Sequence, residues 1–472
     1  MIKKLNDLEV GSWSRQGIRC RLKVVAWWNL VFDLPAHRWV SILIFLSTFQ
    51  SLTCRLQAQT LEDHLLTAAE NNPEVQAYFH EYLAALEKVP QAGTLPEPEL
   101  SIGLFIRPME RLMGNQHADL QLMQMFPWFG SLGIRKDEAS KMAQARYEAF
   151  RMVKNELLYQ VKEAWHQLSR LNEEIKITKA HLSILEKYER LALVRYQSSS
   201  SGPGGSNSPT DKAMNSATPM PSSSTSMGDV LRIRMERNEL ENAISLLSDT
   251  RQALVAEFNE LLNRDPEEGL ELPDMLANEP LNRGRLELLD SIKGYNPRLK
   301  MLDAESAAYA SQKTMAKLEG RPMMGAGVNY MAFSPRTENG MNMGGNNMVM
   351  PMLKITLPIY RKKFKSMEKA AELNQEASLK KKENTINQLS TQWRNALRDW
   401  DDADRRVNLY QKQTDLAEQT LDLLMTAYAN DGKAFEDLLQ VQQQLLDYQL
   451  KRIMAIVDKH NSLAQLENLA GI

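Results

Sequence analysis

Two very long apolar stripes constrain this chain more than any other feature. In each stripe, apolar side chains recur at alternating steps of four and three residues, the pattern of helices packed by knobs into holes. The first stripe runs from Leu157 to Leu185 and the second from Ile386 to Tyr428. A helix over residues 131–196 would be roughly 100 Å long. A compact globular domain has no need for such a rod.

The sequence is duplicated in tandem. An Asn-Pro pair opens a predicted helix at Asn72 and again at Asn296. Segment 126–129 (Phe-Pro-Trp-Phe) is matched by segment 357–360 (Leu-Pro-Ile-Tyr), and Tyr196 is matched by Tyr428, at nearly equal offsets. These pairs predict that one structural unit occurs twice.

The duplication sets the predicted domain organisation. Each copy begins with helices and short strands, continues in a long helix and ends in a returning helix, predicted at 229–262 and 435–466. The insert of the first copy is rich in Ser, Pro, Gly and Met, a composition typical of disorder. The predicted segments are an N-terminal extension with signal peptide (1–58), a first repeat (59–264) with an insert (197–227), a linker (265–295) and a second repeat (296–472).

Each copy also contains a pair of short two-faced segments. Residues 100–106 alternate apolar and small or polar side chains, the period-two signature of a strand, and residues 119–126 do so more weakly. A loop is predicted between them at 107–117. The second copy repeats the pattern at 326–331 and 353–357, with a polar loop between. We therefore predict four strands in the chain.

The N-terminal segment has the features of an export signal. Arg38 precedes an apolar run over residues 39–52, which is too short to span a bilayer comfortably. Cleavage after Ala58 is one prediction, and lipidation of Cys54 is the alternative. Because Cys20 and Cys54 are the only cysteines, the rest of the chain has no thiol for disulfides, nucleophiles or metal sites. No other segment predicts a membrane-spanning helix, so any insertion would be by strands.

Charge and motifs exclude several function classes. The formal net charge is −2 and the basic excess lies in residues 1–58, which gives no case for nucleic-acid binding. The sequence has no Gly-rich phosphate loop, no Ser/His/Asp order and no defensible pair of catalytic carboxylates. Its seven histidines are scattered without ligand spacing. We expect neither an enzyme nor a cofactor.

After residue 58 the chain resembles the TolC-like outer-membrane efflux channels. The duplication, the strand pairs ending in an aromatic or aliphatic residue plus Pro, and the Tyr…Asp-(Val/Leu)-Leu turns carry the resemblance. Segments 126–130 and 350–363 resemble the Bacteroidetes-type subset. The resemblance implies a homotrimer in the outer membrane, with a twelve-stranded β-barrel above a periplasmic α-helical tunnel. It also implies passive efflux with a periplasmic adaptor and an inner-membrane pump of the resistance-nodulation-division (RND) class.

A physical constraint points to the same assembly. Four strands cannot close a barrel, and lipid does not tolerate an open sheet edge. Strands from several chains must therefore share one barrel, and three chains would supply twelve. The expected fold class is mainly α, with duplicated long α-hairpins and four membrane strands per chain.

The resemblance places a periplasmic gate at the two helical turns. It implicates Asp229 in the first copy, and Tyr428, Lys433 and Asp437 in the second. A threefold ring of Asp437, paired with Tyr428 or Lys433, would attract cations and hold the aperture shut. The competing interpretation is that Asp229 and Asp437 cap the returning helices, which Asp does well. Both roles are compatible.

Methionine is the other unusual feature, with 25 in the chain. Thioethers are soft ligands suited to Cu(I) or Ag(I), and M-x-M spacing brings sulfurs onto one face of a strand. The alternative is that methionine fills irregular apolar surface. The candidate metal residues lie around the second loop and strand: Met341, Met343, Met348, Met350 and Met352.

Two functions remain open beside general efflux. One is the same channel dedicated to Cu(I) or Ag(I). The other is a secreted coiled-coil scaffold without a pore, which would be soluble without detergent. The two-faced strands favour the channel, because a scaffold does not need them.

Overall fold

The computed structural model describes residues 60–200, 227–272, 276, 284–338, 340–431 and 435–471. Residues Thr60–Ile472 form one compact unit, to which all of these belong. Several sequence-based predictions fall outside the described residues. These are the signal segment with Cys20, Cys54 and Ala58, most of the insert, and Lys433.

The two predicted rods are single helices. Helix α6 spans Ser131–Ser200 with 70 residues, and α10 spans Arg361–Asp431 with 71. Their apolar stripes are buried, as the heptad pattern predicts. Examples are Leu157, Val161 and Leu168 on α6, and Leu389, Ala396, Ala403 and Val407 on α10.

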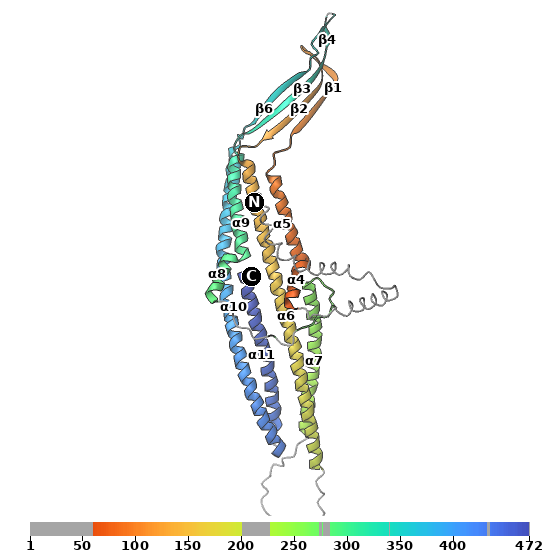
Figure 1. Ribbon diagram of the computed structural model, residues 1–472, viewed down its shortest axis with the longest axis vertical. Coiled ribbons are helices and arrows are strands. Elements are labelled where there is room, and N and C mark those ends of the chain that lie inside the picture. Colours follow the sequence, from red (N-terminus) through yellow and green to blue (C-terminus); the bar gives the residue numbers. More distant parts are fainter. Residues whose placement is uncertain are drawn as a thin grey trace, which may run out of the picture. The chain divides into compact units, whose positions relative to one another are not determined.

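Each rod is covered by a returning helix and by shorter helices. Helix α7 (Met227–Leu261) packs on α6, and α11 (Phe435–Ala470) packs on α10. In the first repeat α4 (Leu61–Asn71) and α5 (Pro73–Ala92) also contact α6. In the second, α9 (Pro297–Glu319) lies between α10 and α6, and α11 contacts α6, so the two repeats share one interior (Figure 1). The predicted linker contains a helix, α8 (Arg285–Tyr295).

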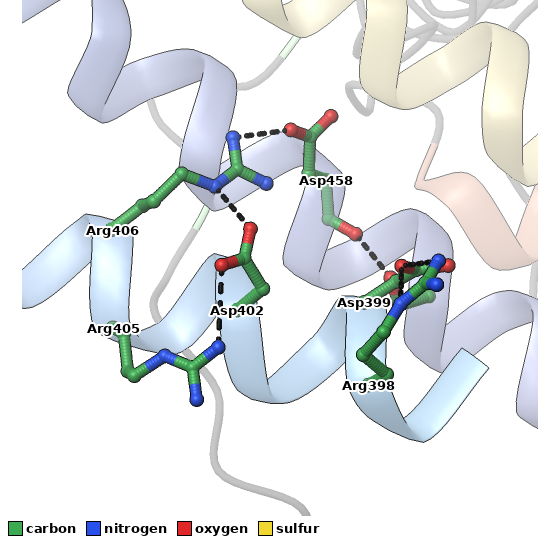
Figure 2. A network of polar contacts seen from close by, with 7 residues as sticks. Arg398, Asp399, Asp402, Arg405, Arg406 and Asp458 are labelled. Carbon is green, nitrogen blue, oxygen red and sulfur yellow. Dashed lines mark hydrogen bonds and ion pairs between the residues drawn. The ribbon is translucent and has the colours of Figure 1, made fainter. Parts of the chain in front are cut away.

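Ion pairs clamp α10 to α11. The Arg406 guanidinium donates to Asp402 on its own helix (2.8 Å) and to Asp458 on α11 (2.9 Å), as Figure 2 shows. Arg405 also donates to Asp402. Hydrogen bonds from Arg405 and Arg406 lower the pKa of Asp402, which keeps it ionised. One arginine thus bridges both helices of the second hairpin.

The strands of both repeats form one antiparallel sheet. Its members are β1 (Glu99–Arg111), β2 (Gly114–Phe126), β3 (Met323–Ser334) and β6 (Met348–Thr356), in the order β1-β2-β3-β6 (Figure 1). The sheet follows α5 and α9 in the chain and leads into α6 and α10. The predicted set of four strands is confirmed.

The predicted loop at 107–117 is wrong. Strand β1 continues to Arg111, and β2 begins at Gly114 after a tight turn, where Gly114 has a φ of 117°. The register shifts between Leu104 and Met109, around Pro108, which has no N–H to donate. This irregularity interrupts the alternation of side chains while the backbone stays extended. A prediction from periodicity alone therefore places the end of the strand too early. The second predicted loop contains a small hairpin, β4 (Arg336–Glu338) with β5 (Met341–Met343).

None of the helices in the described ranges combines the length and the apolarity needed to cross a bilayer.

Candidate functional site

The four-stranded sheet has its apolar face outward. Leu104 is 75% exposed and Leu353 88% exposed, whereas Met123 is 3% and Asn329 6% exposed on the opposite face. A sheet in a water-soluble protein buries its apolar face and exposes its polar one. This arrangement is reversed, and reversal is the pattern of strands that face lipid on one side.

Strand register determines what lies on the other side, here called the enclosed face. Gln121 of β2 pairs with Asn329 of β3, which pairs with Met350 of β6. Because side chains alternate along each strand, every second residue from these joins the same face. That face combines thioethers with polar groups: Ser101, Asp119, Gln121, Met123, Met125, Met323, Asn329, Met331, Met348, Met350, Met352 and Lys354.

The far end of the helices holds a compact apolar cluster from both repeats. It includes Tyr188 and Ala192 of α6, Ile233 of α7 and Phe435 of α11. Tyr428 of α10 is 4% exposed, with its ring 5.3 Å from that of Phe435. The guanidinium of Arg195 lies 4.7 Å from the Tyr428 ring centre. All four long helices therefore meet here.

Polar bridges join α7 to α11 beside this cluster. Arg232 and Glu436 form an ion pair of 3.3 Å, and Gln443 Nε2 donates to Glu236 Oε2 at 2.5 Å. A groove between the two helices is lined by these four side chains and by Met235, Glu239, Leu439 and Gln440. We call this region, with the first turns of α7 and α11, the tip.

Comparison with known proteins assigns the fold. No family model matches the chain, and no curated protein matches it by sequence. Solved structures do match, with TM-scores of 0.68 for the outer membrane protein VceC of Vibrio cholerae, 0.66 for the open MtrE outer membrane channel of Neisseria gonorrhoeae and 0.68 for the CmeC outer membrane channel of Campylobacter jejuni. This is the TolC-like fold.

The identities are low and the coverage is high. VceC, MtrE and CmeC are 16%, 16% and 12% identical to this chain, respectively. The alignments cover 87%, 88% and 87% of this chain, and 96%, 89% and 85% of those proteins. The predicted fold class is confirmed, because duplicated long α-hairpins and four barrel strands per chain define the TolC-like fold. The Bacteroidetes-type assignment stays a prediction.

Three residues of the predicted gate set, Asp229, Tyr428 and Asp437, lie near the tip in different environments, and their gating role stays a prediction. Asp229 and Asp437 lie at the third helical positions of α7 and α11, and Asp437 is exposed. The prediction that they cap these helices is wrong, because a capping residue precedes the first helical residue. Tyr428 is instead part of the apolar cluster. The Tyr428 side chain is buried by neighbours that include Arg195 and Phe435, and sequence spacing alone does not predict these contacts.

The structure divides the predicted methionine set. Met348, Met350 and Met352 share the enclosed face of β6. Met341 and Met343 lie on β5, in the other sheet, and are 72% and 52% exposed. The enclosed face gains Met123, Met125, Met323 and Met331 from β2 and β3, which sequence reasoning missed. Only the strand register could have revealed them.

A buried polar ladder connects α6 with α11 and so joins the two repeats. Gln442 Nε2 lies 2.7 Å from His181 Nδ1, and the other His181 nitrogen lies 2.8 Å from Gln449 Oε1. His166 Nδ1 lies 2.8 Å from Asn461 Oδ1. Burial lowers the pKa of His166 to about 4 and lowers that of His181 as well. Both imidazoles are therefore neutral near pH 7.

No group of three His, Cys, Asp or Glu side chains in the described ranges is placed to hold a metal ion.

Proposed function

We propose that this protein is an outer-membrane exit channel, a homotrimer that passively conducts solutes from the periplasm to the exterior. Three copies would close a twelve-stranded barrel in lipid and continue it into a periplasmic helical tunnel. The chain would do no chemistry and would use no energy source of its own.

The reversed sheet is the observation that carries this proposal. Its outward face is aliphatic and exposed, and the order β1-β2-β3-β6 leaves β1 and β6 each with one edge unpaired in the described chain. An open edge in hydrocarbon costs several kcal/mol per unpaired backbone group. Pairing β6 of one copy with β1 of the next removes that cost and encloses the polar face around a lumen.

The tip is the proposed gate and docking end. Asp229, Tyr428, Lys433 and Asp437 form the proposed gate set, and the groove between α7 and α11 is the proposed contact for a periplasmic adaptor. An inner-membrane pump of the RND class would deliver the cargo. The bridges from Arg232 to Glu436 and from Gln443 to Glu236 support a closed tip that opens when these helices part.

Conductance in planar bilayers tests the proposal. Purified full-length protein should run as a heat-modifiable trimer on gels and give discrete conductance steps, while heat-denatured protein in the same detergent gives none. A folded, monomeric protein that stays soluble without detergent would identify the non-pore scaffold instead and end the channel proposal.

A further inference from the structure

We infer that the enclosed face of the sheet is a thioether site for soft monovalent cations of the Cu(I) and Ag(I) class. The inference rests on the proposed function only in placing this face on the lumen of a channel. It concerns a site built from β2, β3 and β6.

Methionine is segregated to one face of β6. The enclosed positions of that strand are Met348, Met350 and Met352, whereas its outward positions include Val349, Leu353 and Ile355. Leucine or isoleucine would fill space on either face equally well. The chain therefore separates thioethers from branched aliphatic side chains by face, which packing alone does not require.

Two glycines of β3 form a cradle for sulfur. A Cβ on Gly325 would lie 2.5 Å from the Met125 sulfur and 3.3 Å from the Met123 sulfur. A Cβ on Gly327 would lie 3.0 Å from the Met123 sulfur. Both thioethers thus occupy the space that a side chain on β3 would fill, so they lie over β3 toward β6.

Across β3, the same two glycines face β6. Gly327 pairs with Met352, and Gly325 with Lys354. Because these glycines have no side chains, no side chain of β3 separates the Met123 and Met125 thioethers from Met352 on the same face of β6. Soft d¹⁰ cations prefer such sulfur donors to the oxygen donors of Ca²⁺ or Mg²⁺ sites.

Asn329 gives a second, independent indication of a ligand. It lies on β3 next to this cradle, paired with Met350 on one side and Gln121 on the other. It is 6% exposed, and its Oδ1 is buried without a hydrogen-bond partner among the described residues. A buried carbonyl oxygen without a hydrogen-bond partner is destabilising. A bound cation would satisfy this oxygen, whereas an apolar solute would not.

The remaining charged side chains of this face are one carboxylate, which favours a cation, and the ammonium of Lys354, which does not. Asp119 lies on this face, paired with Met331. Tyr330 points outward with Val328, so the aromatic side chain of β3 on this face is Phe333, which lies beyond the stretch paired with β6. Surfaces that hold apolar solutes usually rely on aromatic rings.

Silver binding by the full-length protein in detergent tests the inference. The probe is Ag(I) as the nitrate in chloride-free buffer. All variants carry Cys20→Ser and Cys54→Ser, so that no thiol competes. We expect binding on the order of one ion per chain, weakened by at least about tenfold in Met348→Leu/Met350→Leu/Met352→Leu. The matched control is Met324→Leu, a methionine on the outward face of β3, which should bind like the parent.

Two milder variants control for the case in which the triple variant loses Ag(I) binding because it misfolds. Met350 is 38% exposed, so Met350→Leu leaves the buried part of this face intact. Gly325→Ala keeps every sulfur but displaces that of Met125. Each should weaken Ag(I) binding while trimer formation is unchanged. Equal affinity in parent, triple variant and Met350→Leu would overturn the inference, as would binding of a lipophilic dye at this face without any binding of Ag(I).

Conductance of the same preparations separates the two proposals. The triple variant should conduct ions like the parent while losing Ag(I) affinity. If neither preparation conducts, yet the parent binds Ag(I) and the triple variant binds it at least about tenfold more weakly, the channel proposal fails and the thioether site stands.

Discussion

A single asparagine performs the same two tasks in each repeat. Asn72 Oδ1 accepts hydrogen bonds from the backbone of Glu74 and Val75, and so caps α5. Its Nδ2 donates to the carbonyl oxygen of Leu261 at the end of α7. Asn296 repeats both contacts at the start of α9, with Leu469 as its acceptor. The Asn-Pro pair therefore fixes where each repeat closes on itself.

Substitution of either asparagine should separate these two tasks. We expect Asn72→Ala to lower stability by about 1–2 kcal/mol, because it removes the cap and the tie to Leu261. Asn72→Ser keeps a capping oxygen and loses only the tie, so its loss should be smaller. The midpoint temperature of thermal unfolding measures both stability losses, and the same two substitutions at Asn296 should rank in the same order. An equal loss for Ala and Ser would show that the cap contributes nothing.

Acid should weaken the packing between the repeats through His166. Its pKa falls from 6.5 to about 4 because burial disfavours the charged imidazolium. The unfolded chain binds a proton that the folded chain does not, so stability is complete above pH 6.5 and decreases as pH falls toward about 4. The full loss is roughly 3 kcal/mol.

Unfolding temperatures between pH 7.5 and pH 4.5 test this linkage. His166→Gln retains a polar side chain that does not titrate, and should show a smaller acid loss than the parent protein. His80→Gln, at an exposed position, is the control and should follow the parent. Identical pH profiles for parent and His166→Gln would contradict the role of His166.

At the scale of elements, local patterns were sufficient for the helices and insufficient for the sheet. The heptad stripes of α6 and α10 repeat many times within one segment, so their length and buried face follow from sequence. The sequence also predicted which face each strand residue occupies where the alternation is regular, as from Leu100 to Leu104. The end of β1 could not be predicted in this way, because the register shift near Pro108 breaks the alternation. The methionines of β2 and β3 join those of β6 only through cross-strand register, which a single segment does not encode.

Adjacent residues of β2 should respond oppositely to the same charge. Leu122 is 51% exposed on the outward face, and Gln121 lies on the enclosed face. We expect Leu122→Lys to cost about 2–4 kcal/mol near the bilayer midplane and to reduce trimer insertion. Gln121→Lys should insert normally and shift ion selectivity toward anions. Heat-modifiable trimer in outer-membrane fractions and reversal potentials measure these effects, and equal insertion of both variants would argue against a lipid-facing outward side.

At the scale of the whole molecule, the tip couples the two repeats. Arg234 and Arg237 of α7 both donate to Glu189 of α6, at 2.6 and 2.9 Å, which holds the first hairpin together. The contacts from α7 to α11 then join the first hairpin to the second. Sequence spacing located this tip but could not give the pairs between α7 and α11, because these link side chains more than 200 positions apart.

Weakening the α7–α11 bridges should favour the open tip. Both side chains of the Arg232–Glu436 pair are more than half exposed, so the pair contributes at most about 1 kcal/mol, a factor of roughly five in the ratio of closed to open forms. Arg232→Ala combined with Gln443→Ala removes both bridges and should raise the ratio of open to closed channels in planar bilayers, by up to about that factor for the ion pair, with the loss of the Gln443 hydrogen bond adding to it. Lys451→Ala breaks an ion pair within α11 only and should leave gating unchanged. If the double variant opens no more often than Lys451→Ala, the closed state is held elsewhere, and the apolar cluster around Tyr428 becomes the next element to test.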